Sequence, residues 1–378
     1  MEYPAEDLDV PLETSDAVPT AANITELKIA AKSAVLMEVK TGEILYESNI
    51  DEKTPPASIT KIMSLLLIME AIEQGKLSYE TTVTASEHAC SMGGSQIWLE
   101  TGEQMTVDEL LKAAVIASAN DATVALGEAV AGSEEGFVAM MNERAEKLGM
   151  SSTHFENCTG LDAENHYSTA HDVAIMSCEL LKHKDIRKYS TVWMDTLRDG
   201  KSELVNTNKL VRFYEGCTGL KTGTTSTAGY CLSASAEKNG MELVAVIMDA
   251  DKSTERFEAA KKLLNYGYAN FIFTEISADL GENPQVRVKK GVKSSVGASQ
   301  KENFNLLLSK NAAGDIKQMI EIKDEITAPV KKGDLLGFAK VFKGEEQVGV
   351  IEIVANEDVK KLDLIICLGI LLKNLVCL

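Results

Sequence analysis

The sequence has no Cys-x-x-Cys pair, although it contains seven cysteines. Their odd number and wide spacing exclude a zinc cluster and a small disulfide scaffold, so we expect no metal and no cofactor. Basic residues are also scarce, with 38 Lys and Arg against 57 Asp and Glu and a net charge of −19. Because nucleic-acid affinity rests on cations that neutralise phosphates, this balance excludes nucleic acid as a partner.

Both ends of the chain lack a clear targeting or spanning signal. Residues 1–24 have neither the positive start nor the apolar stretch of a signal peptide, and we expect a disordered acidic tail there. Residues 358–378 end in an apolar run, but its uninterrupted part, 364–372, is well short of the ~20 residues of a spanning helix. We expect this segment to be a peripheral membrane anchor, with a docked core helix and a spanning helix as alternatives.

The remaining 45% hydrophobic chain is long enough for two domains. We predict strands at 34–39 and 43–46, helices at 58–74, 106–117, 121–130, 134–147 and 168–181, strands at 219–222, 229–236 and 243–248, and a helix at 253–266. Strands at both ends of a helical middle indicate one α+β domain over residues 25–272. Short alternating apolar runs beyond it predict a small all-β domain over residues 273–357.

The first chemical motif is Ser58-Ile59-Thr60-Lys61 at the start of the apolar helix. Residues i and i+3 share one face of a helix, so the two functional side chains are adjacent. Burial can lower the pKa of a lysine until its free amine takes a proton from a serine hydroxyl. Ser58 is therefore a candidate nucleophile and Lys61 its candidate base, although a capped helix start would give the same pattern.

The second motif is Ser118-Ala119-Asn120, between two predicted helices. Its side chains can point out of the turn, so Ser118 could relay a proton to a leaving amine and Asn120 could bind a substrate carbonyl. Helix capping is the alternative reading of the same residues.

The third motif is Lys221-Thr222-Gly223-Thr224, on a predicted strand. A cation, a hydroxyl and a residue without a side chain allow a substrate strand that carries a carboxylate to lie alongside. The amides of Ser58 and Thr224 would then form an oxyanion hole. A second copy, residues 40–42, precedes the nucleophile in a predicted surface turn, and we regard it as a decoy.

The order S-x-x-K, S-x-N, K-T-G resembles that of the penicillin-binding proteins, specifically the low-molecular-mass D-alanyl-D-alanine carboxypeptidases. Further blocks carry the resemblance over residues 30–357: residues 56–61, 93–95 with 102–103, 157–161, 167–170 with Asp172, 206–210 and 216–221. The resemblance implies a β-lactamase-like catalytic domain followed by the family's C-terminal β module.

The resemblance also implies an acyl-enzyme mechanism. Ser58 would attack the bond between two terminal D-alanines of a peptidoglycan stem peptide, and Lys221, Thr222 and Thr224 would hold the terminal carboxylate. β-Lactams would acylate the same serine. Such a protein acts outside the cytoplasm, at the outer face of the bacterial cytoplasmic membrane.

Three alternatives remain at this point. A relative of this kind can cut peptidoglycan cross-links as an endopeptidase. A class A β-lactamase has the same motif order, but its E-x-x-L-N run is missing between the second and third motifs, where Glu156 and Glu164 are the nearby candidates. A catalytically idle wall-binding scaffold would have no chemical reason to keep every motif residue.

Overall fold

The computed structural model describes residues 27–310, 316–364 and 366. The chain divides into two compact units between Asn270 and Phe271. Strand β10 (Phe271–Ile276) pairs along its whole length with β13 (Phe304–Ser309), so residues 271 and 272 join the second unit rather than the first, where we had placed them. The predicted N-terminal tail and most of the predicted anchor segment lie outside the described residues.

The first unit contains an antiparallel five-stranded sheet in the order β2-β1-β9-β8-β7. Its strands are β1 (Ser33–Glu38), β2 (Ile44–Ser48), β7 (Cys217–Thr225), β8 (Gly229–Lys238) and β9 (Met241–Ala250). Strands from the two ends of the unit are therefore neighbours, and β7, which carries K-T-G, lies at an edge. An edge strand has one row of backbone groups available for a further strand.

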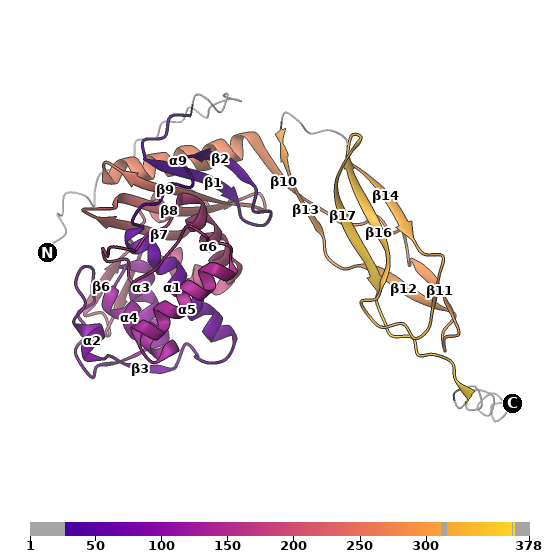
Figure 1. The fold of residues 1–378 in the computed structure, drawn as a ribbon, viewed down its shortest axis with the longest axis horizontal. Helices are drawn as coiled ribbons and strands as arrows, with labels where there is room; N and C mark the ends of the chain where they lie inside the picture. Colours follow the sequence, from indigo (N-terminus) through magenta and orange to yellow (C-terminus); the bar gives the residue numbers. More distant parts are fainter. Residues whose placement is uncertain (1–26, 311–315, 365, 367–378) are drawn as a thin grey trace. The chain divides into compact units, whose positions relative to one another are not determined.

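Helices cover both faces of this sheet. Helix α9 (Ser253–Asn270) packs on one face, and the remaining helices gather on the other (Figure 1). They are α1 (Lys61–Glu73), α2 (Glu87–Cys90), α3 (Val107–Ile116), α4 (Asn120–Ala131), α5 (Glu134–Lys147), α6 (Ala170–Lys182), α7 (Arg187–Ser190) and α8 (Leu210–Phe213). Two short hairpins complete the cluster, β3 (Thr82–Thr84) with β4 (Gln104–Thr106) and β5 (Met194–Leu197) with β6 (Ser202–Val205).

Helix α1 is the centre of the helical layer. Residues 61–69 are all buried, and all but Lys61 and Ser64 are apolar, as expected for a helix with apolar side chains on every face. Helix α3 begins with the predicted capping box, in which Thr106 Oγ1 accepts from Glu109 N and Glu109 Oε2 accepts from Thr106 N. The first motif thus lies at the start of α1, and the second follows the end of α3.

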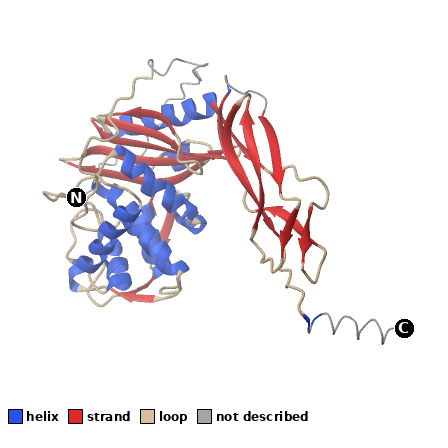
Figure 2. Cartoon of the chain, turned by 45° about the vertical axis from the view of Figure 1, so that its right-hand side comes forward, coloured by secondary structure: helices blue, strands red, loops and turns tan. Residues whose placement is uncertain are grey.

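The second unit is built from strands (Figure 2). Its larger sheet has the order β14-β16-β17-β12-β11-β15, over β11 (Gln285–Lys289), β12 (Ser295–Gln300), β14 (Ile316–Ile322), β15 (Glu325–Thr327), β16 (Leu335–Lys343) and β17 (Glu346–Ala355). Alternate residues of these strands form its apolar core, among them Val286, Val288, Ala339, Val341, Ile351 and Ile353. In the part of the chain that the structure describes, none of the helices has the length and apolar character needed to span a membrane.

Candidate active site

The nucleophile motif lies on a short 3₁₀ turn, η3 (Ala57–Thr60), that runs directly into α1. Ala57 has a φ of 48°, in the left-handed region that a residue with a side chain rarely adopts. The turn leaves Ser58 half-buried, whereas Lys61 is fully buried one helical turn later. The Lys61 Nζ to Ser58 Oγ distance is 3.0 Å, as the i, i+3 spacing predicts.

Lys61 is held by three acceptors. Its Nζ donates to Ser58 Oγ, to Asn120 Oδ1 at 2.5 Å and to the Thr159 carbonyl at 2.8 Å. Burial lowers the pKa of Lys61 from 10.5 to about 7, against smaller opposing effects of Cys158 and Asp121. Lys61 can therefore act as a base near neutral pH, with Ser58 as the group it deprotonates.

The second motif forms the connection between α3 and α4. Ser118 is buried and has a φ of 62°, which turns the chain so that α4 begins at Asn120. Asn120 Nδ2 donates to the Gly93 carbonyl at 2.6 Å, while its Oδ1 accepts from Lys61. The structure thus brings Asn120 into direct contact with the base, and Ser118 is placed beside it through the chain.

The third motif lies on β7, against the nucleophile turn. A Cβ at Gly223 would be 2.8 Å from the Pro56 carbonyl oxygen and 3.0 Å from Ser58 N, so a side chain would push the strand away. Thr224, whose amide is the expected second donor, is the next residue along the strand. This close approach brings the backbone of β7 next to the Ser58 amide.

Cationic side chains crowd behind β7. Lys221 is 1% exposed and donates from Nζ to the Thr222 carbonyl at 2.9 Å. Burial, with repulsion from Lys61 and Arg256, holds the pKa of Lys221 well below its usual range. An anion bound among these groups would offset the repulsion and favour the ammonium form of Lys221, so the arrangement suits a carboxylate ligand.

Sequence reasoning missed Arg256 on α9. Its Nη1 donates to the Gly223 carbonyl at 3.0 Å and to Thr224 Oγ1 at 2.9 Å. A signal was present, because the buried residues of α9 include 256, 260, 263 and 267, so that this arginine shares the apolar helical face. No spacing rule connects it to K-T-G, because packing of α9 on the sheet makes the contact.

The Thr159 carbonyl was also missed, since backbone acceptors leave no residue-type signature. Asn157 Oδ1 shapes the turn that presents it, accepting from the amides of Thr159, Gly160 and Leu161 at 3.1, 2.7 and 3.2 Å. A Cβ at Gly160 would lie 1.8 Å from the Ala57 carbonyl oxygen. Only glycine lets this turn, residues 157–161, lie against the nucleophile turn.

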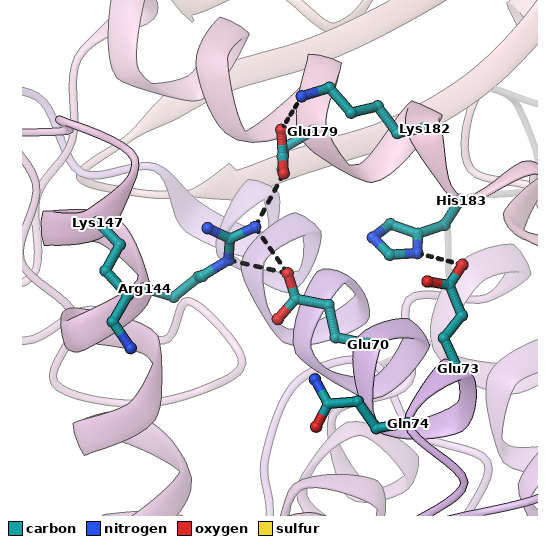
Figure 3. Close-up of a pocket in the computed structure, with 8 residues that line it drawn as sticks. All are labelled: Glu70, Glu73, Gln74, Arg144, Lys147, Glu179, Lys182 and His183. Atoms are coloured by element: carbon teal, nitrogen blue, oxygen red, sulfur yellow. Dashed lines mark hydrogen bonds and ion pairs between the residues drawn. The ribbon is translucent and has the colours of Figure 1, made fainter. Parts of the chain in front are cut away.

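A separate charged hollow lies between α1, α5 and α6 (Figure 3). Arg144 there pairs with Glu70 at 2.7 Å and with Glu179 at 2.8 Å, and His183 Nδ1 lies 2.7 Å from Glu73. The ions of this hollow neutralise one another, and none of the three motifs contributes a residue to it. We interpret it as an ion-pair network that joins three helices.

The chain matches two protein families and a curated relative. The family described as D-alanyl-D-alanine carboxypeptidase matches residues 19–252, and that described as penicillin-binding protein 5, C-terminal domain, matches residues 280–361. The chain is 46% identical to the D-alanyl-D-alanine carboxypeptidase DacF of Bacillus subtilis over 341 residues, covering 89% of this chain and 88% of DacF.

Two solved structures show the same fold. Penicillin-binding protein 5 from Haemophilus influenzae superposes with a TM-score of 0.75 at 31% identity, over 88% of this chain and 98% of that one. Penicillin-binding protein D2 from Listeria monocytogenes, in an ampicillin-bound form, has a TM-score of 0.59 at 32% identity, over 64% and 99%.

These matches confirm the predicted α+β catalytic fold with a following β domain, and the predicted type of enzyme. The chain belongs to the D-alanyl-D-alanine carboxypeptidase family of serine peptidases, within the low-molecular-mass penicillin-binding proteins.

Proposed function

We propose that this carboxypeptidase removes the terminal D-alanine from peptidoglycan stem peptides through an acyl-enzyme on Ser58. The observation that carries the proposal is the buried Lys61 amine at 3.0 Å from Ser58 Oγ, with a pKa lowered to about 7. A nucleophile with an adjacent neutral base is the minimum that serine acyl transfer needs.

In the acylation step, Lys61 is a free amine whose two N–H groups donate to Asn120 Oδ1 and the Thr159 carbonyl. Its lone pair takes the proton from Ser58 Oγ, and Oγ attacks the carbonyl carbon of the penultimate D-alanine. The carbonyl oxygen becomes an oxyanion that accepts hydrogen bonds from Ser58 N and Thr224 N. As the C–N bond breaks, Ser118 relays a proton to the leaving amine and D-alanine departs. Water then attacks the ester, releases the shortened peptide and returns the proton to Ser58.

The substrate lies along the edge of β7 as an added strand. Lys221 and Thr222, with Thr224, bind the terminal carboxylate, and Gly223 leaves room for the peptide backbone. Arg256 supports this end of the strand through its hydrogen bonds to Gly223 O and Thr224 Oγ1. The Asn120 amide nitrogen carries two hydrogens; one goes to Gly93 O, and we assign the other to a substrate carbonyl.

The bound peptide has one direction on β7. Its carboxylate is near Lys221 and its scissile carbonyl near Thr224, so the rest of the peptide continues past Thr225 toward the loop that contains Asp162. Asp162 Oδ1 accepts from Thr225 Oγ1 at 2.8 Å, which ties this loop to the end of the strand.

β-Lactams acylate the same serine in this proposal, in line with the ampicillin-bound relative. Action on peptidoglycan places the enzyme outside the cytoplasm, at the outer face of the membrane. We further propose peripheral membrane contact through residues 358–378, which follow the β domain.

The exposed positions of Glu156 and Glu164 argue against a β-lactamase. Glu156 Oε2 accepts from Asn165 N at 3.1 Å, within its own loop, whereas a deacylating glutamate must activate a water beside the acylated serine. The acyl-enzyme formed with penicillin should therefore be long-lived.

The test is intact mass after incubation with benzylpenicillin, for the native chain and Ser58→Ala. We expect one stable adduct that is absent in the variant, and release of D-alanine from a peptide ending in D-Ala-D-Ala. No adduct would favour an idle scaffold, and rapid penicillin hydrolysis a β-lactamase. Cleavage of cross-linked dimers in preference to the linear peptide would favour an endopeptidase.

A further inference from the structure

His166 is a buried histidine close to the catalytic turn that the mechanism above does not use. It is 3% exposed, and both ring nitrogens have partners. Nε2 lies 2.8 Å from Thr60 Oγ1, and Nδ1 accepts from the Glu156 amide at 3.0 Å. Because a backbone N–H can only donate, Nδ1 carries no proton and Nε2–H donates to Thr60.

The two partners of this imidazole belong to the two segments that hold Lys61. Thr60 directly precedes Lys61 in the chain and is fully buried. Glu156 directly precedes Asn157, whose side chain shapes the turn that presents the Thr159 carbonyl to Lys61 Nζ. The His166 ring thus connects the segment that carries Lys61 to the segment whose Thr159 carbonyl accepts from Lys61.

The packing around His166 fixes its position and its protonation state. Its ring packs edge-to-face on Phe155, with centroids 5.7 Å apart. Burial lowers the pKa of His166 to about 4, against opposing effects of the nearby carboxylates, so the ring is neutral throughout the range in which Lys61 titrates. A neutral ring with one donor and one acceptor acts as a rigid spacer between the two segments.

We infer that His166 is a positioning residue for acylation: it holds Thr60 and the 157–161 turn at the spacing that keeps Lys61 enclosed against Ser58. The inference rests on the proposed function, because it concerns the base of that reaction. Without the ring, the turn separates from η3, water reaches Lys61, and the ammonium form is stabilised at the expense of the base.

The experiment measures the second-order rate constant for benzylpenicillin acylation of the full chain between pH 5 and 9. We expect His166→Ala to lower it about 10- to 100-fold at pH 7, the range for a misplacement of about 1 Å. We also expect the acid limb of the profile to move up by roughly half a pH unit or more. His166→Gln keeps one donor and one acceptor at similar separation, so it should restore both values to near those of the native chain.

Two further variants distinguish a positioning role of His166 from a general effect on stability. Tyr189→Phe removes another hydrogen bond made by a buried ring, the one from Tyr189 Oη to Asp108 Oδ1 at 2.7 Å, and should lower thermal stability without changing the acylation profile. Thr60→Val keeps His166 but removes the acceptor of its Nε2–H. It should reproduce the effect of His166→Ala, which covers the case in which that variant does not fold.

Native-like rate and midpoint in folded His166→Ala or Thr60→Val would overturn the inference. An unacylated native chain would instead overturn the proposed function itself.

Discussion

Protonation of Lys61 should switch the enzyme off as the pH falls. The pKa of about 7 leaves about 90% of Lys61 as the free amine at pH 8 and about 3% at pH 5.5. Acylation should therefore slow by about 30-fold between these values, along a one-proton curve with its midpoint near 7. A lysine at its ordinary pKa of 10.5 would instead leave the rate rising through pH 10.

Burial is the main cause of this pKa shift, and the size of the shift measures how strongly the fold disfavours the ammonium form of Lys61. A shift from 10.5 to about 7 corresponds to a differential of on the order of 5 kcal/mol between the two protonation states. Since the folded pKa is depressed, Lys61 favours the folded state most above pH 10.5, and this contribution is lost as the pH falls toward 7. The stability contribution is lost between pH 10.5 and 7, as the lysine of the unfolded chain takes up a proton, whereas activity is lost around and below pH 7, as Lys61 of the folded enzyme does so.

The assay is rapid mixing with benzylpenicillin followed by quenching and intact mass, which reports the first covalent step alone. Penicillin keeps its charge across the range, so the curve belongs to the enzyme. Lys61→Arg is the control, because a guanidinium stays protonated and should give little acylation at any pH. A flat profile from pH 5 to 9 in the native chain, or a midpoint above 9, would refute the claim that burial makes Lys61 the base.

Three further outcomes follow from the contacts around the site. Gly223→Ala places a methyl group 3.0 Å from Ser58 N and should slow acylation at least tenfold at unchanged fold, as circular dichroism would check; a native rate would contradict the close packing of the strand. Arg256→Met removes the hydrogen bond to Thr224 and should raise KM for a D-Ala-D-Ala peptide more than it lowers kcat, and a pure kcat effect would argue for a different role. Arg144→Met breaks the partly exposed ion pairs of the charged hollow and should cost about 1 kcal/mol in urea unfolding, with an unchanged acylation rate as the sign that the hollow is structural.

Local sequence pattern predicted the elements that carry the motifs. The apolar run after Ser58 reads as a buried helix because every face is apolar, and the capping box at Thr106 marks the start of the next helix. The Lys61 to Ser58 contact follows from helical geometry alone. Where a contact is set by spacing within one element, the sequence is sufficient.

Contacts between elements that are distant in the chain could not be predicted from the sequence. The Thr159 carbonyl, the Arg256 guanidinium and the His166 ring reach the site through packing of a turn or a helix that shares no spacing with the motifs. Ala57, with its left-handed backbone, lies in the turn against which Gly160 and Gly223 both pack closely, and no local sequence rule predicts that packing. Residues of this kind can be identified only once the three-dimensional fold is known.

The charged groups of the site are cationic, although the chain as a whole is acidic. The protein carries a net charge of −19, yet Lys61, Lys221 and Arg256 are all buried beside one strand edge. Surface charges more than about 8 Å away are screened at physiological salt, whereas buried groups keep their interactions at short range. A carboxylate therefore meets the local cations rather than the net charge of the protein. Burial, with the repulsion among those cations, holds the pKa of Lys221 below its usual range. A bound carboxylate would offset the repulsion and favour the ammonium form of Lys221, so part of the affinity for a carboxylate would come from the charges gathered at this strand edge.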